Sequence, residues 1–263
     1  MPKRLLLVVV MGLGLGTLVT GLGNARLRWL PTVPAFEPSP RTGDPVAGER
    51  LGRTVLVCTE CHGEDLGGAV MIDAPLFARV AAPSLTRRFE LVELDRAVRH
   101  GLGRNRALVL MPSDGYRQLT DQELADVGAW LEHLPPANRD VGSTWLGPFG
   151  VMAMLAGSLH VPAFSVDHSA VPSRATDEDE RLLTVSGCVG CHGADLKGRE
   201  LGGGLPRAPA LVGLPGGRAA FERAVRGGRG GDGRELAPVM PWRAFADLSD
   251  SEVDSLWRAV EHR

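Results

Sequence analysis

An internal repeat covers most of this chain and constrains its fold more than any other sequence feature. The nine residues from Cys58 to Leu66 (Cys-Thr-Glu-Cys-His-Gly-Glu-Asp-Leu) recur from Cys188 to Leu196 as Cys-Val-Gly-Cys-His-Gly-Ala-Asp-Leu. An Arg-Ala-Val-Arg piece and a Met-Pro piece follow in the same order, at offsets of 127 and 129 residues against 130 for the first. Conserved order at nearly constant offset predicts two copies of one domain that differ by small loop insertions.

The segments outside the repeat complete the predicted domain organisation. The chain has 263 residues, enough for two domains of ordinary size. We expect an export or anchoring segment at 1–28, a Pro-rich spacer at 29–44, a first domain at 45–135, an uncharged connector at 136–173 and a second domain at 174–263.

The N-terminal segment contains an uncharged run from Leu5 to Gly23. At 19 residues this run is longer than the apolar region of a signal peptide and approaches the roughly 20 residues of a membrane-spanning helix. Gly23 and Ala25 are small residues at cleavage-type spacing, which keeps removal of the segment open. We expect a retained membrane anchor, with a cleaved export signal as the alternative.

Each copy of the repeat closes with a helix whose start is marked. Thr120 with Glu123 and Ser249 with Glu252 are capping-box pairs, in which each side chain binds a free amide at the helix N-terminus. Further helices are expected at 47–57, 89–98, 178–185 and 221–225, and no convincing alternating strand pattern is present. The predicted fold class is all-α.

The connector has no acidic or basic residue between Asp140 and Asp167. Its segment from Pro148 to Leu159 has 12 residues, too few to span a bilayer as a helix. We expect this segment to form a helix that packs between the two domains or on a partner protein.

The repeated Cys-x-x-Cys-His motif predicts covalently attached haem. Two thiols at this spacing can each add to one haem vinyl group, and the adjacent imidazole can reach the iron. A zinc site would need a third and fourth ligand that recur in both halves, and a thioredoxin-like dithiol would need a βαβ setting. Neither condition is met, so Cys58, Cys61, Cys188 and Cys191 are predicted to attach two haems, with His62 and His192 on the irons.

Met111 and Met240 are the predicted second axial ligands. Met111 lies 49 residues after His62 and Met240 lies 48 residues after His192, and each is followed by Pro. A lone methionine usually fills a gap in a core, but two at matching positions are harder to explain that way. The thioether is a known partner for His-ligated haem iron. Met71 has no counterpart in the second half and is expected in the core or a loop.

With these motifs, each half resembles a class I cytochrome c domain, and the whole chain is similar to di-haem cytochromes c that carry an N-terminal membrane anchor. The resemblance implies two tandem loop-rich helical domains, each wrapped around a covalently bound haem c. It also implies that the carbonyl of Pro83 or Pro209, in Pro-x-Leu segments, accepts the ring N–H of the axial histidine. Tyr116 and Phe245 align at an offset of 129 and are expected to line the two haem pockets.

The closing helices differ between the halves in one respect. Members of the family usually carry an aromatic residue there that packs near the haem, and Trp130 suits that role. Counted from the helix caps, its counterpart is Ala259, whereas Trp257 lies on another face. The second helix is therefore expected to pack differently.

Five histidines lie outside the repeated motif. His100 is replaced by Gly227 in the other copy and is expected at the surface or at a helix end. The others lie near helix ends or in the connector, and they become candidate iron ligands only if a methionine is not one: His133, His160, His168 and His262.

The functional expectation is a di-haem carrier of single electrons between a membrane or periplasmic donor and an acceptor. The alternatives are a cytochrome subunit of a larger oxidoreductase, such as a dehydrogenase or terminal oxidase, or a di-haem peroxidase. A net charge of −2 argues against nucleic-acid binding, and redox proteins are the expected partners. Since haem attachment in the family takes place on the exported side, we expect the periplasmic side of the bacterial inner membrane, or the soluble periplasm if the segment is cleaved.

Overall fold

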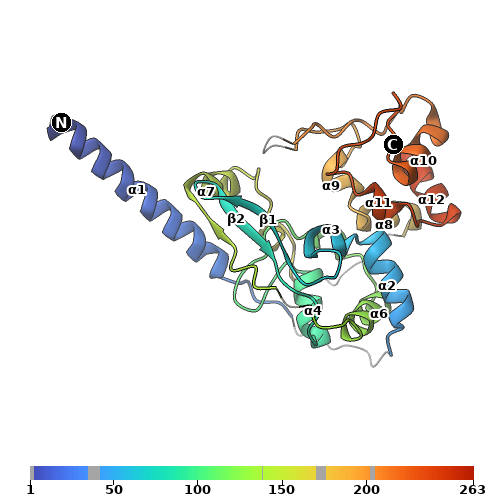
Figure 1. The fold of residues 1–263 in the computed structure, drawn as a ribbon, viewed down its shortest axis with the longest axis horizontal. Coiled ribbons are helices and arrows are strands. Elements are labelled where there is room, and N and C mark those ends of the chain that lie inside the picture. The colour runs from blue at the N-terminus through green and yellow to red at the C-terminus, as the bar shows by residue number, and fades with distance from the viewer. Residues whose placement is uncertain (1–2, 35–41, 138, 170–175, 202–204) are drawn as a thin grey trace.

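The computed structural model of the chain describes residues 3–34, 42–137, 139–169, 176–201 and 205–263. Parts of the predicted spacer (35–41) and connector (138 and 170–173), and the first two residues of the predicted second domain, lie outside the described residues. The chain forms a long N-terminal helix, two helical halves and a small sheet (Figure 1). Among the helices of the described residues, none is both long and apolar enough to cross a membrane.

The long helix α1 (Lys3–Arg28) comes first. The N-terminal half follows it and is built from short helices joined by long loops. Its helices are α2 (Pro45–Arg50), the π-helix η1 (Leu51–Val55), α3 (Cys58–His62), α4 (Leu91–Val98), α5 (Ser113–Tyr116) and α6 (Asp121–Glu132). Asp44 caps α2 by accepting a bond from the amide of Val46 at 2.8 Å. The predicted helix at 47–57 is therefore α2 continued by η1, which ends two residues earlier.

The C-terminal half repeats this order with α8 (Glu178–Val185), α9 (Cys188–His192), α10 (Gly217–Gly227), α11 (Trp242–Phe245) and α12 (Asp250–Glu261). Both predicted capping boxes are present. The hydroxyl of Thr120 accepts from the Glu123 amide at 3.1 Å, and Ser249 accepts from Glu252 at 3.3 Å. The glutamates in turn accept from the cap amides at 2.7 and 2.8 Å. The sequence therefore located the starts of both closing helices correctly.

A three-stranded antiparallel sheet is present that the sequence pattern did not reveal. Strands β1 (Ala69–Ala74) and β2 (Ala78–Ala82) form a hairpin, and β3 (Trp145–Leu146) of the connector pairs with β2, giving the order β1-β2-β3. The residues of β2 alternate between buried and half-buried. The helices fit the all-α expectation, and the sheet is an addition to it.

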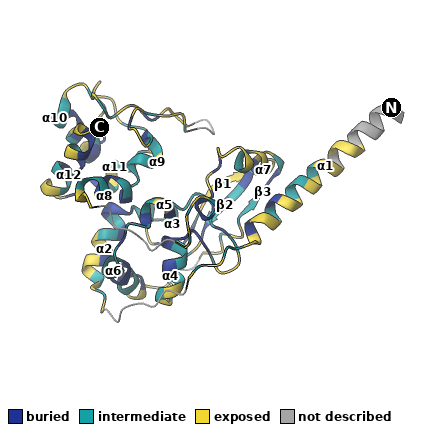
Figure 2. Ribbon diagram, turned by 180° about the vertical axis from the view of Figure 1, so that it is seen from behind, coloured by how far each residue is buried: buried dark blue, intermediate teal, exposed yellow. Residues whose placement is uncertain are grey.

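The connector helix was expected between the two halves or on a partner protein, and the first of these positions is not observed. Its helix α7 (Pro148–Leu155), which is shorter than predicted, lies against α1 and β3, and a 3-10 turn, η2 (Pro162–Phe164), contacts α5. These elements surround a second hydrophobic core on the outer side of the N-terminal half, with Leu27, Leu146 and Val151 among its buried members. The apolar connector covers the hairpin and the base of α1 because their buried faces lie outside the main core (Figure 2).

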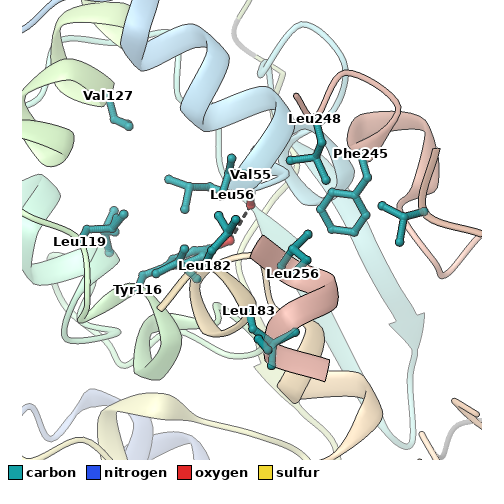
Figure 3. Packing of buried hydrophobic residues seen from close by; sticks show 14 of the residues in the cluster. Val55, Leu56, Tyr116, Leu119, Val127, Leu182, Leu183, Phe245, Leu248 and Leu256 are labelled. Atoms are coloured by element: carbon teal, nitrogen blue, oxygen red, sulfur yellow. Dashed lines mark hydrogen bonds between the residues drawn. The ribbon is translucent and has the colours of Figure 1, made fainter. Parts of the chain in front are cut away.

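The two halves meet through equivalent elements. Helix α5 packs on α8, and α11 packs on η1, so the segment before each Cys-x-x-Cys-His contacts the segment after the other Met-Pro. Tyr116, Leu182 and Leu256 belong to one hydrophobic core that runs through this contact (Figure 3). The arrangement has an approximate twofold symmetry.

An ion pair is repeated by the same symmetry. Arg181 binds Glu123 at 3.0 Å, and Arg50 binds Glu252 at 3.0 Å. Arg50 lies eight residues before its Cys-x-x-Cys-His motif and Arg181 lies seven before its own. The wider turn of the π-helix η1 takes up the extra residue. Each closing helix therefore receives an arginine from the other half on the glutamate of its capping box.

Candidate functional site

The Cys-x-x-Cys-His motif forms the same one-turn helix in both halves. The residue before the first cysteine is left-handed in each, with φ of 47° at Val57 and 78° at Gly187. The glycine after the histidine has φ of 84° at Gly63 and 87° at Gly193. Only glycine adopts these last values without strain, so the motif turns sharply on both sides of the helix. A β-branched valine in the left-handed region is unusual and marks local strain at the first motif.

All four cysteine thiols are unpaired and partly or fully shielded. Burial, the largest effect on each, raises the pKa of Cys58 to about 12 and that of Cys61 to about 11. Burial also raises the pKa of Cys188 and Cys191. The thiols are therefore neutral at pH 7, unlike the thiolates of a redox-active dithiol, whose pKa is lowered.

Each motif histidine is buried and fixed by a backbone carbonyl. His62 Nδ1 donates to the Pro83 carbonyl at 2.8 Å, and His192 Nδ1 donates to the Pro209 carbonyl at 2.8 Å. Burial lowers the pKa of both imidazoles, so they are neutral at pH 7. With Nδ1 carrying the proton, Nε2 is left as the atom able to bind a metal.

The two predicted axial methionines lie in nearly identical turns. Pro112 after Met111 has φ −81° and ψ 49°, and Pro241 after Met240 has φ −80° and ψ 46°. A carbonyl-to-amide bond of 2.8 Å closes the turn after each methionine. Both methionines are partly buried and pack against the core that also touches Cys58. The structure thus gives both methionines one backbone setting.

Tyr116 and Phe245 follow these turns on α5 and α11 and are almost fully buried. The Tyr116 hydroxyl donates to the Leu56 carbonyl at 2.5 Å, a bond drawn in Figure 3. Burial, together with the neighbouring thiols of Cys58 and Cys61, raises the pKa of this phenol. The tyrosine therefore lies beside the thiols of its own half, and the phenylalanine has no such polar contact.

Trp130 is buried on α6 and packs on η1, where a Cβ at Gly52 would lie 2.2 Å from the ring. In the C-terminal half the corresponding Ala259 is also buried, and Trp257 instead contacts Phe221 with ring centroids 5.7 Å apart. The two closing helices thus present aromatic rings on different faces.

His100 was expected at the surface or at a helix end. It lies at the end of α4, as the second alternative has it, but it is only 4% exposed and is not a surface residue. Its Nδ1 lies 3.0 Å from Nδ1 of His168, and the rings stack with centroids 5.2 Å apart. The burial comes from the connector, which the sequence did not place against α4.

The side chains present fit covalently bound haem. Each half offers two neutral thiols, one neutral imidazole with a free Nε2 and one thioether, which is a complete attachment and ligand set for a haem c. Among the described residues, the buried ring nitrogens of Trp130 and Trp242 have no hydrogen-bond partner. Buried donors normally have one, and a haem carboxylate is a group of the right kind. Trp242 was missed from the sequence because its counterpart in the repeat is Ser113.

A comparison with known protein families finds a match for the N-terminal half. Residues 48–135 match the family model described as Cytochrome c, a range that runs from α2 to the loop just beyond the closing helix α6. Among curated proteins no match is found. The match supports a cytochrome c domain in the N-terminal half, and with it an electron-transfer protein that binds haem c.

Proposed function

We propose that the chain is a di-haem cytochrome c that carries single electrons from a membrane or periplasmic donor to an acceptor protein. In this proposal His62 and Met111 hold the iron of the first haem, and His192 and Met240 hold that of the second. Cys58 and Cys61 attach the first haem, and Cys188 and Cys191 attach the second.

One observation supports the proposal of a second haem: the backbone hydrogen bonds around the motif are the same in both halves. The amide of Gly68 binds the His62 carbonyl at 2.9 Å, and that of Gly198 binds the His192 carbonyl at 2.8 Å. The next residues in the network are Leu66 and Leu196, both fully buried and left-handed, with φ of 56° and 55°. Left-handed leucines are uncommon, and the match supports the same cofactor in both halves.

The residues around each site suit one-electron transfer with little rearrangement. When bound, haem supplies an iron couple that changes charge by one electron. The Pro83 and Pro209 carbonyls fix the histidine tautomers and raise the basicity of Nε2, which favours the higher iron charge. Burial of the imidazoles keeps water away, and the Met-Pro turns keep the thioethers in place.

The contact between the halves supports electron exchange within the molecule. The segments that touch across it are those next to the two motifs and the two methionines. Equal Met-Pro turns in both halves favour a carrier over a di-haem peroxidase, which needs an open or displaceable position at one iron. A cytochrome subunit of a larger oxidoreductase would use the same residues in the same way.

We also propose that the N-terminal segment is retained and holds the protein at the periplasmic face of the membrane. The Asn24 amide group exchanges two bonds with the backbone of Leu146, at 2.8 and 3.0 Å. Leu27 is fully buried, and its carbonyl accepts from the Ala107 amide at 2.7 Å. Cleavage after Ala25 would remove Asn24 and leave the polar backbone of β3 without its partner.

Haem stoichiometry tests the proposed function. The full chain, expressed in a bacterium that attaches haem c, is expected to carry two haems, measured by intact mass and by the absorbance of the pyridine complex. The double variants Cys58→Ala/Cys61→Ala and Cys188→Ala/Cys191→Ala are matched, and each is expected to retain one haem. A wild-type chain with a single haem, lost only in the first variant, would contradict the proposal.

A further inference from the structure

Helix α7 exposes one apolar face that nothing in the functional site uses. Phe149, Met152 and Leu155 follow one another at three-residue spacing, and their exposed fractions are 56%, 59% and 76%. Gly150 and Val151 of the same helix are buried. Leu76, at the tip of the β1-β2 hairpin, is 65% exposed and accepts a bond from the Phe149 amide at 3.1 Å. We call Leu76, Phe149, Met152 and Leu155 the apolar collar.

The apolar collar continues the exposed surface of α1. A Cβ at Gly23 would lie 2.3 Å from a Val151 methyl carbon, so α7 touches α1 at this position. Toward the N-terminus α1 exposes Leu22, Leu18 and Leu15, and in both views it projects away from the body beyond α7 (Figures 1 and 2). Exposed apolar side chains are therefore present on the free part of α1, on α7 next to it and at the hairpin tip.

Positive charge borders the apolar collar on the side of the body. Arg26 and Arg28 are exposed in the last turn of α1. Burial of Arg106, and then the charge of Arg28 close to it, lower the pKa of Arg106. Arg26 packs on the ring of Phe164, 3.8 Å from its centroid, and Trp29 beside it is 73% exposed. Exposed tryptophan and arginine next to an apolar surface are typical of the membrane–water boundary.

The spacing of these features matches the depth of a lipid interface. Arg26 and Arg28 follow Gly23 by three and five residues, which is about 5–8 Å along a helix. An interfacial helix buries its apolar face about 5–10 Å into the boundary between headgroups and acyl chains. Arginines at this height would meet the phosphates of anionic lipids.

We propose that the apolar collar enters the outer part of a lipid bilayer beside α1, with Arg26, Arg28 and Arg106 at the anionic headgroups. The proposal rests on the membrane attachment proposed above and adds a second contact, which orients the two halves relative to the membrane. A lipid surface is favoured over a protein partner because α7 contacts α1, which also exposes leucines, and because cations lie near the apolar collar. No charged residue interrupts the connector between Asp140 and Asp167.

Photocrosslinking in the full haem-loaded chain tests this proposal. A benzophenone amino acid replaces Met152 or Leu155 in the apolar collar, Leu18 in α1, or Val239 in the C-terminal half, which is 40% exposed. Each protein is reconstituted in vesicles of phosphatidylethanolamine and phosphatidylglycerol and irradiated. The crosslinked peptides are identified by mass, and the haem absorbance reports correct folding.

Lipid adducts at positions 152 and 155 but not at 239 are expected. Adducts at 18 without adducts at 152 and 155 would overturn the proposal and leave the N-terminal attachment standing. Absence of lipid adducts at all of these positions would overturn both, and so would adducts to a second protein chain alone at 152 and 155. Adducts at 152 and 155 without any at 18 would support the apolar collar and count against α1 as the attachment.

Discussion

The Met-Pro turns are the residue-scale feature on which the proposed ligand set depends. Met111 and Met240 share backbone angles to within a few degrees at the following proline. They also share partial burial against the same core. A thioether held in one position by its backbone is suited to remain on an iron through changes of charge, since little rearrangement of the ligand is needed.

Replacing either methionine is expected to change one haem only. Met111→Ala and Met240→Ala should each convert about half of the low-spin absorbance to a form without a thioether ligand, because the alanine offers no donor. A lower reduction potential of that haem is expected as well. Absorbance of the oxidised protein near the sulfur-to-iron charge-transfer band and a redox titration measure both effects.

Met71 provides the matched control. It lies on β1 in the same half as Met111 and is 40% exposed. Met71→Ala is expected to leave the spectrum and both potentials unchanged. Loss of low-spin character in this variant, or an unchanged spectrum in Met111→Ala, would show that Met111 is not the ligand.

Much of the candidate site could be predicted from the sequence because its chemistry is local. The spacing in Cys-x-x-Cys-His and the capping boxes each involve residues a few positions apart. The left-handed Val57 could not be predicted, because valine disfavours that conformation and only the turn around it enforces it. The burial of His100 was also missed, since it depends on His168, 68 residues away.

At the scale of elements, the connector is attached to α4 by the stacked pair His100 and His168. Nδ1 of His100 lies 3.0 Å from Nδ1 of His168, and Nε2 of His168 donates to the Ala163 carbonyl at 3.0 Å. The same stretch of connector binds the loop before Met111, where the Leu110 amide donates to the His160 carbonyl at 3.0 Å. The pair therefore supports the Met-Pro turn of the first half.

Acid is expected to weaken this attachment. Burial, then the charges of Arg117, His168, Arg96 and Arg99, lowers the pKa of His100 to about 4, while Asp95 lies 3.7 Å from its Nε2 and its own pKa is raised by burial. In the unfolded chain His100 binds its second ring proton near pH 6.5. The stability that the neutral ring gives the folded protein is therefore complete above that pH and is lost as the pH falls to about 4. The loss is on the order of 3 kcal/mol.

Urea unfolding of the haem-loaded protein between pH 7 and pH 4 measures this effect. The free energy of unfolding should fall less steeply in His100→Gln than in the wild type, because glutamine does not titrate. His133→Gln, at the exposed end of α6, is the control and should fall as the wild type does. Equal slopes in all three proteins would exclude the histidine pair as the cause.

The elements that the sequence did not predict are those fixed by distant partners. Strands β1 and β2 are rich in alanine, which has low strand preference, and the edge of β2 is completed by β3 from the connector, more than 60 residues later. Helix α7 was predicted as a helix from its bounding prolines, but its position against α1 depends on Gly23 and Asn24. Local patterns do not contain that information.

For the whole molecule, the approximate twofold symmetry determines how the halves hold together. The ion pair of Arg181 is more enclosed than that of Arg50: their side chains are 7% and 48% exposed. An enclosed pair leaves an unpaired buried charge when one partner is removed, whereas an exposed pair is screened by water. The two symmetric contacts therefore differ in energy.

Removing the enclosed arginine is expected to uncouple the halves. Arg181→Ala should lower the free energy of unfolding by about 1–3 kcal/mol, because Glu123 remains partly buried without its cation. Arg50→Ala should cost less than about 1 kcal/mol. Differential scanning calorimetry of the haem-loaded chain measures both, and Arg181→Ala is expected to broaden or split the transition.

Arg207→Ala is the control, since its pair with Glu200 lies on the surface of the C-terminal half, away from the contact. It is expected to leave the transition unchanged. An Arg50→Ala variant that costs as much as Arg181→Ala, or a single sharp transition in Arg181→Ala, would contradict the proposed asymmetry.

The symmetric contact also has the self-complementary form of a homodimer interface. Each half presents the segment before its motif and the segment after its methionine, and each receives the other's copy of the same two. Isologous surfaces of this kind allow two identical chains to pair without any further feature. One copy of this domain thus contains the whole contact surface, and the peptide link makes the pairing independent of protein concentration and restricts it to these two partners.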